Sequence, residues 1–246
     1  MDREKEQAKN PGTSPYFLIA LSRNERWEVR EAVAENPSTP PGILAFLAQD
    51  KDRFVREAVA HNEATPPEVL SQLAQDKSWE VRCEVVHNCY IQDTTLIDMA
   101  DDENEQVREA VARHTDMPLV LAELAKDQNR DVREAVADSS STPPDTLAQL
   151  AKDKDAEVRM AVAENEATPD EVLSALANDE DWSVRYWVAQ NPCTPADTLA
   201  VLAVDKEWQV SEAVARNPSA QPNHGLSDEV LLSDATVPVS DTMEIN

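Results

Sequence analysis

Apolar and polar residues recur in one pattern that returns eight times along the chain. Each unit centres on a Val-Arg or Val-Ser pair, whose valines are Val29, Val55, Val81, Val107, Val132, Val158, Val184 and Val210. Six of the seven intervals are 26 residues and the other is 25, so each unit is expected to stack on the next in the same way. The pattern therefore predicts an array of repeats.

The first half of each unit reads as a short helix with one narrow apolar stripe. Its leucines are three residues apart, as in Leu70 and Leu73. Thr65 is predicted to be the N-cap, because a Pro that suits the first helical position follows it. Glu68 then stands where it would complete a capping box.

The second half of each unit predicts a second short helix. Val55, Ala58 and Val59 share one face of it, and an Asn such as Asn62 follows its last residue in six units. Asn tolerates the left-handed conformation that often ends a helix, so these asparagines are predicted to be C-caps. Strand signals are absent.

Helices this short are marginal alone, so their stability has to come from stacking. The fold class is therefore predicted to be all-α, a helical-repeat solenoid of about eight 26-residue two-helix units over residues 13–219. Residues 1–12 are predicted to be a charged N-terminal leader. Residues 220–246 are predicted to be an acidic C-terminal tail, in which residues 227–232 could form a short helix that caps the last unit.

Two polar positions hardly change from unit to unit. An Asp stands five residues before the Val in seven units, and an Arg directly follows the Val in seven. They are Asp50, Asp76, Asp102, Asp127, Asp153, Asp179 and Asp205, with Arg30, Arg56, Arg82, Arg108, Arg133, Arg159 and Arg185. Either they form a structural ladder of carboxylates and guanidinium groups, or the arginines form a ligand-binding row. Asn24 and Ser211 replace the first Asp and the last Arg, which favours the structural ladder.

The repeat resembles two known families. The phrase D-x-x-x-x-V-R-x-x-A is similar to the second-helix signature of HEAT repeats. The fuller V-R-x-x-V-A-x-N-P-x-T-P-x-x-L-x-x-L-A resembles the bacterial leucine-rich repeat variant proteins over about residues 13–219. That resemblance implies a right-handed α-α superhelix. Some members carry an iron–sulfur cluster on an N-terminal group of cysteines, but the first cysteine here is Cys83, so no cofactor is expected.

The net charge of −26 limits the possible partners. Nucleic acid is not expected to bind, because phosphate binding needs a basic surface. A basic protein or peptide is the natural complement, although the charge could equally serve solubility alone. No apolar run is long enough to span a membrane and no secretory signal is present, so a cytoplasmic location is expected.

Residues with catalytic or metal-binding chemistry are few. The three cysteines form no C-x-x-C, and no phosphate loop or H-E-x-x-H motif occurs. Stacking could bring Cys83, His61 and His87 to one zinc ion, although histidines at a variable position are usually only solvated. A resemblance to HEAT-like bilin lyases offers an enzyme or accessory factor as an alternative, with Glu84, His87 and Tyr90 as its polar constellation.

Departures from the repeat mark candidate contact sites. Four tryptophans share one position, two residues before the Val: Trp27, Trp79, Trp182 and Trp208. They are predicted either to form an exposed ridge or to cover the ladder arginines. Unit seven adds Tyr186 and Trp187, and unit three departs from the repeat around Glu84, His87 and Tyr90. These residues and the four tryptophans are the candidate partner surface, although simple drift in a tolerant array would also explain the departures. One residue is missing near residues 114–116, where the curvature should change. We therefore predict a non-catalytic scaffold that presents its second-helix face to a protein or peptide.

Overall fold

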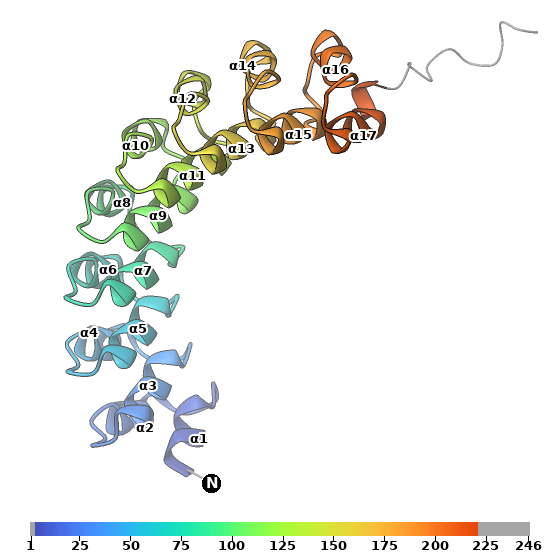
Figure 1. The fold of residues 1–246 in the computed structure, drawn as a ribbon. Helices are drawn as coiled ribbons and strands as arrows, with labels where there is room; N and C mark the ends of the chain where they lie inside the picture. The colour runs from blue at the N-terminus through green and yellow to red at the C-terminus, as the bar shows by residue number, and fades with distance from the viewer. Residues whose placement is uncertain (1–2, 221–246) are drawn as a thin grey trace, which may run out of the picture.

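The computed structural model describes residues 3–220 and contains seventeen α-helices followed by one 3₁₀ turn, η1 (Pro218–Ala220). No strand occurs in this part of the chain. The helices form two rows (Figure 1). The odd-numbered row consists of α1 (Arg3–Lys9), α3 (Trp27–Glu35), α5 (Arg53–His61), α7 (Trp79–His87), α9 (Glu105–His114), α11 (Arg130–Asp138), α13 (Ala156–Glu164), α15 (Trp182–Gln190) and α17 (Trp208–Arg216).

The even-numbered helices have seven residues each and lie on the outer side of the curved array (Figure 1). They are α2 (Pro15–Leu21), α4 (Pro41–Leu47), α6 (Pro67–Leu73), α8 (Asp93–Met99), α10 (Pro118–Leu124), α12 (Pro144–Leu150), α14 (Asp170–Leu176) and α16 (Ala196–Leu202). Each odd helix packs against the next odd helix, and each even helix packs against the odd helix that follows it. The prediction of an all-α repeat solenoid is therefore confirmed.

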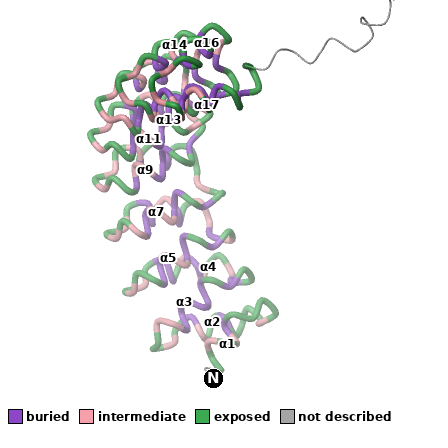
Figure 2. Tube along the Cα trace, turned by 45° about the vertical axis from the view of Figure 1, so that its right-hand side comes forward, coloured by how far each residue is buried: buried purple, intermediate pink, exposed green. Residues whose placement is uncertain are grey.

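The core lies between the two rows. Val55 and Val59 of α5 are fully buried, as are their counterparts in the other units, and Leu44 and Leu47 of α4 are buried opposite them. Buried residues consequently follow the odd helices from one end of the array to the other (Figure 2). Because each unit contributes one valine stripe and one leucine stripe, no unit closes its own core and the stacking is obligatory.

The N-terminal leader belongs to the packed array. Residues 3–9 form α1, which packs against α3 in the place that a preceding odd helix would occupy. Thr13 donates to the carbonyl oxygen of Gln7 at 2.6 Å, as Thr39 does to Val33 one unit later. Residues 1–12 are predicted to be a leader because most of them are charged or polar, and α1 accordingly buries only one apolar residue, Ala8. A mostly polar half-unit is what a solenoid needs at its end.

The array bends near the middle. In Figure 1 it runs upward from α1 to α7, turns through α9 to α13, and continues to the right through α15 and α17. The turn begins at the unit that lacks one residue, in agreement with the sequence-based expectation. We call α1–α8 the N-terminal arm, α9–α11 the junction and α12–α17 the C-terminal arm. The predicted capping helix at residues 227–232 lies outside the described residues.

Candidate functional site

Two predicted caps have other roles in the structure. Thr65 is not an N-cap: it is buried, and its hydroxyl donates to the carbonyl oxygen of Val59 at 2.6 Å. Pro66 takes the N-cap position of α6, with no side-chain cap bond, so Glu68 completes no capping box. Asn62 does follow α5, but its backbone is extended (φ −69°, ψ 122°) and not left-handed. Both polar side chains serve the packing between segments.

The asparagines join successive units by side-chain hydrogen bonds. In six units the Nδ2 group donates to two carbonyl oxygens of the preceding unit, at 2.6–2.8 Å and 2.9–3.2 Å. The Oδ1 atom accepts the N–H of the second residue after the Asn. The six residues are Asn36, Asn62, Asn88, Asn165, Asn191 and Asn217. Sequence reasoning missed these links, although a row of Asn with no Gly among them hinted that the side chain mattered.

The ladder residues pair between units in a bidentate geometry. Each Arg donates from Nε and Nη2 to the Asp of the following unit, at 2.5–2.7 Å and 2.8–3.0 Å. Its Nη1 group donates at 2.7–2.9 Å to the carbonyl oxygen of the residue six positions earlier. The guanidinium groups are thus occupied by the protein itself, which argues against a ligand-binding row of arginines.

The ladder changes the pKa of its carboxyl groups. Burial of Asp153 opposes its ionisation, but the hydrogen bonds from Arg133 and from the backbone of Asp155 outweigh this and lower its pKa. At the N-terminal end the ladder continues with exchanged partners: Asn24 donates to Glu4 of α1 at 3.0 Å. α1 thus supplies a further half-unit, in which an Asn–Glu hydrogen bond takes the place of the Asp–Arg pair.

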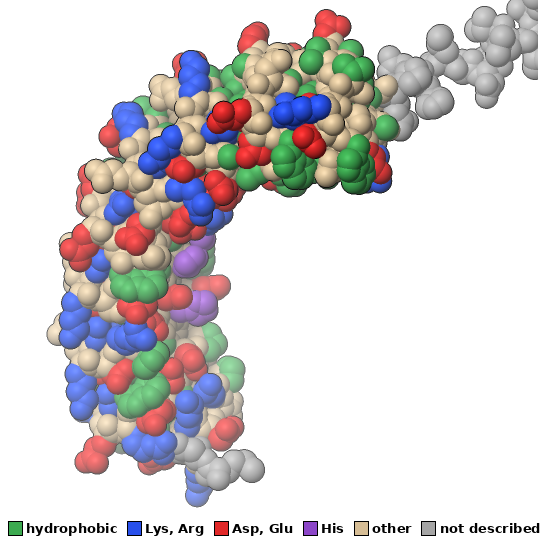
Figure 3. All heavy atoms as spheres, in the orientation of Figure 1, with side chains coloured by type: hydrophobic (Ala, Val, Ile, Leu, Met, Phe, Trp, Pro, Cys, Tyr) green, Lys and Arg blue, Asp and Glu red, His purple; other side chains and the backbone are tan. Residues whose placement is uncertain are grey.

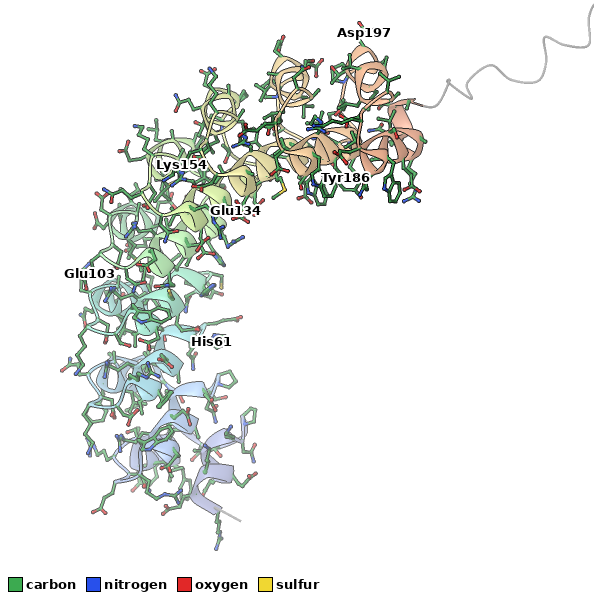
Figure 4. All side chains as sticks on the ribbon, in the orientation of Figure 1. His61, Glu103, Glu134, Lys154, Tyr186 and Asp197 are labelled. Carbon is green, nitrogen blue, oxygen red and sulfur yellow. The ribbon has the colours of Figure 1, made fainter. Side chains whose placement is uncertain are left out.

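The side of the odd row that faces away from the even helices is formed by equivalent positions of each helix. We number the odd helices α3 to α17 from the residue two before the Val, so that Trp182 is position 1 of α15, and call positions 1, 2, 5, 6 and 9 the odd-helix face. Position 6 is a buried Ala in five of these helices and carries a large side chain only in α7 and α15. His61, Glu134 and Tyr186, at positions 9, 5 and 5, mark its course along the inner side of the curve (Figure 4). This face runs along the whole array.

The aromatic residues of this face gather in the C-terminal arm. The ring of Tyr186 lies edge-on to both Trp182 and Trp187, with centroids 6.4 and 5.7 Å apart. Trp182 is 42% exposed and Trp208, one unit on, is 66% exposed. Figure 3 shows apolar side chains gathered on the inner side of this arm. In the N-terminal arm Trp79 is also partly exposed, whereas Trp27 stacks on Phe54 with ring centroids 5.1 Å apart.

Family models match three segments of the chain: the leucine-rich repeat variant domain at residues 2–63 and the leucine-rich repeat variant at 53–78 and 156–181. A solved structure described as a leucine-rich repeat variant with a novel repetitive structural motif has 27% identity and a TM-score of 0.71, and the match covers 87% of this chain and 86% of that one. The repeats belong to the leucine-rich repeat variant family.

Two further solved structures resemble this leucine-rich repeat variant array more weakly. YibA of Escherichia coli has 19% identity and a TM-score of 0.47, over 87% of this chain and 94% of that one. A designed armadillo repeat protein in complex with the peptide (KR)4 has 17% identity and a TM-score of 0.22, over 87% and 95%. No curated protein sequence matches the chain significantly.

The predicted metal and polar constellations are dispersed in the leucine-rich repeat variant array. Among the described residues no group of three or more His, Cys, Asp or Glu side chains could hold a metal ion. His61 lies 3.3 Å from Glu84, whereas the ring of His87 contacts His114, with centroids 4.5 Å apart. Cys83 is half-buried, and desolvation raises the pKa of its thiol to about 11.

The enzyme alternative gains no support from its three residues. In the part of the chain that the structure describes, no hydrogen bond or ion pair joins Glu84, His87 and Tyr90. Tyr90 is 55% exposed. None of the described helices is long and apolar enough to cross a bilayer. The aromatic cluster is therefore the feature of this leucine-rich repeat variant array that most resembles a binding site.

Proposed function

We propose that this protein is a non-catalytic scaffold that binds a protein or peptide on its odd-helix face, chiefly in the C-terminal arm. The observation that supports this best is the exposure of Trp182 and Trp208 beside Tyr186 and Trp187. Tyr186 and Trp187 pack against the edge of the core, whereas Trp182 and Trp208 lie outside it. Exposed aromatic clusters of this kind are typical of the centre of protein interfaces.

The charge of the chain favours a basic partner. With 48 acidic and 22 basic residues, of which seven arginines are held in the ladder, the surface is strongly negative. Such a field speeds the approach of a positively charged partner and disfavours nucleic acid. All three cysteines are free, which suits a reducing compartment such as the cytoplasm.

The proposal is tested by photo-crosslinking in extracts of the native host. A photoreactive residue replaces Ser183, at position 2 of α15, in one variant and Asp197, on the outer side of the array (Figure 4), in the matched control. The Ser183 variant is expected to form a discrete adduct with a protein, and addition of Trp208→Leu to this variant should abolish the adduct. The Asp197 variant should not form it.

Two outcomes would contradict the scaffold proposal. One is equal labelling of the same proteins from both positions, since that would indicate unspecific collision. The other is a small molecule bound to the purified native protein that is chemically altered during incubation, because a scaffold has no turnover. Circular dichroism of each variant checks that the helical array is intact.

A further inference from the structure

Position 1 of one odd helix meets position 2 of the next along the odd-helix face. Between α5 and α7, the guanidinium of Arg53 at position 1 pairs with the carboxylate of Glu80 at position 2. The same register produces an ion pair between α11 and α13 at 3.5 Å. Between α15 and α17, these two positions are occupied by Trp182 and Gln209. This interface therefore has an amide where those two have a carboxylate, and a ring where they have the guanidinium. Trp79 and Gln106 form the same combination between α7 and α9, but there the Gln side chain is exposed.

Gln209 carries an acceptor that receives no hydrogen bond. Its Oε1 atom is shielded from solvent and has no partner among the described residues. An unpaired acceptor of this kind is costly, and buried polar groups in folded proteins are nearly always satisfied. At the equivalent interface between α5 and α7, the guanidinium of Arg53 donates to the carboxylate of Glu80. Gln209 Oε1 therefore lacks a hydrogen-bond donor, which an N–H group could supply as Arg53 does for Glu80.

Carboxylates flank the two exposed tryptophans of the C-terminal arm. Asp181, the N-cap of α15, directly precedes Trp182 and uses Oδ1 to accept the backbone N–H of Ser183 at 2.8 Å. Glu207, the N-cap of α17, directly precedes Trp208 and makes no side-chain cap bond. In the N-terminal arm the residues before Trp27 and Trp79 are Arg26 and Ser78.

The cations near this cluster are few. Lys206 lies in the loop before α17, and Arg216 is paired with Glu212 at 2.6 Å. The ladder guanidinium of Arg185 is buried on Asp205. Around the two rings, the face thus offers acceptors and negative charge with little positive charge of its own.

We propose that the C-terminal arm binds an arginine side chain of a partner peptide between Trp182 and Trp208. The guanidinium stacks on an indole ring, donates to Gln209 Oε1 and lies close to the carboxylates of Asp181 and Glu207. This inference rests on the proposed scaffold function and names the chemistry of its partner. Because the acceptor is shielded in the free array, a side-chain rotation accompanies binding.

Arginine fits this site better than lysine does. A guanidinium is planar, stacks on aromatic faces and carries five donors, whereas an ammonium is a compact and strongly hydrated charge. The array itself contains an example of this arrangement. Arg53 lies 4.8 Å from the ring centroid of Phe54 while its guanidinium pairs with Glu80 of the next unit.

The test is a titration of the full chain with a synthetic octapeptide of alternating Arg and Ser, followed by tryptophan fluorescence and calorimetry. Lysine and citrulline versions of the peptide separate charge from shape. We expect saturable binding of the arginine peptide, weaker binding of the lysine peptide, and at least about tenfold weaker binding of the citrulline peptide. Trp182→Leu and Trp208→Leu should each lower the affinity about tenfold or more.

Two further variants make the test specific. The pair Trp182→Arg with Gln209→Glu copies the Arg53–Glu80 arrangement into the C-terminal arm, so the array's own guanidinium should fill the site and lower the affinity about tenfold. Trp79→Leu removes an exposed Trp of the N-terminal arm and should leave the affinity unchanged. Circular dichroism confirms that each variant is folded.

Three results would overturn the arginine site: equal affinity for the citrulline peptide, an equal loss in Trp79→Leu, or no saturable binding at millimolar peptide. The crosslinking experiment distinguishes these from failure of the scaffold function. An adduct at position 183 that excess arginine peptide does not displace would leave the scaffold standing and remove the arginine site.

Discussion

The two arms of the array share one repeat but present different odd-helix faces. In the N-terminal arm and the junction, charged residues pair from one unit to the next, so the face neutralises itself. These pairs are Lys5–Glu31, Lys9–Glu35, Arg53–Glu80, His61–Glu84, Arg113–Asp138 and Arg130–Glu157. From α13 to α17 no ion pair links successive helices on this face within the described residues, and aromatic rings take those positions.

This contrast shows that stacking and recognition are separate functions of the repeat. The ladder and the Asn links occur in both arms, where they use buried groups between the rows. The odd-helix face can vary because exposed ion pairs contribute little to stability, about 0–1 kcal/mol each. The residues of this face are not needed for stacking. They can therefore change from charged pairs to aromatic side chains without altering the fold.

The largest expected effect tests whether the ladder is equally important in both arms. Arg133→Ala should lower the free energy of unfolding by about 3 kcal/mol, because it leaves the Asp153 carboxylate and two backbone carbonyls without their donor. Arg56→Ala and Arg159→Ala should cost similar amounts in the two arms. Urea unfolding measures all three.

The exposed Arg130 provides the matched control for the ladder. Arg130→Ala removes a guanidinium from the same helix as Arg133, but from the solvent side, and should lower the free energy of unfolding far less than Arg133→Ala does. Equal losses in Arg130→Ala and Arg133→Ala would show that the buried ladder is not what holds successive units together.

The next effect in size concerns the Asn links. Asn62→Ala and Asn165→Ala each remove two side-chain donors to buried carbonyl oxygens, and should each cost about 2 kcal/mol. At the junction, His114 and Ser139 take the Asn position and form no such link to the preceding unit within the described residues. Ser139→Ala should therefore lower the free energy of unfolding by less than about 0.5 kcal/mol. A loss as large as that of Asn165→Ala would contradict the role assigned to the Asn links.

These links mark the limit of what the sequence could predict. The spacing of the apolar residues predicts the period, the two helices per unit and the buried valine and leucine stripes, because burial follows the period of the helix. This spacing does not predict the roles of Thr65 and Asn62. Capping preferences are local rules, and in this array contacts between segments override them. For the site, the shared Trp position was predictable. The orphan acceptor of Gln209 was not, since it depends on which side chain the next unit supplies.

The smallest expected effect is a pH dependence that separates the junction from the ladder. Desolvation raises the pKa of Asp138 and of Glu134, both in α11. The folded state then binds protons more tightly than the unfolded state at these groups, so their contribution to stability falls as pH rises through their folded-state pKa. Six ladder aspartates have lowered pKa values: Asp50, Asp76, Asp127, Asp153, Asp179 and Asp205. Their contribution to stability is complete above the ordinary Asp pKa of about 3.9 and is lost as pH falls through the folded-state pKa.

The free energy of unfolding should consequently pass through a shallow maximum on the acid side of neutrality. It should decline slightly towards pH 7 and steeply below about pH 4, where the ladder aspartates take up protons. Asp138→Asn and Glu134→Gln should flatten the decline towards neutrality and leave the acid side unchanged, whereas Asp153→Asn should alter the acid side. Because Asp138 is 43% exposed at its side chain, solvent weakens its effect, and the change should be smaller than in any ladder variant. Thermal unfolding at pH 3, 5 and 7 tests this, and a steeper neutral decline in Asp138→Asn would show that its ion pair with Arg113 outweighs its burial.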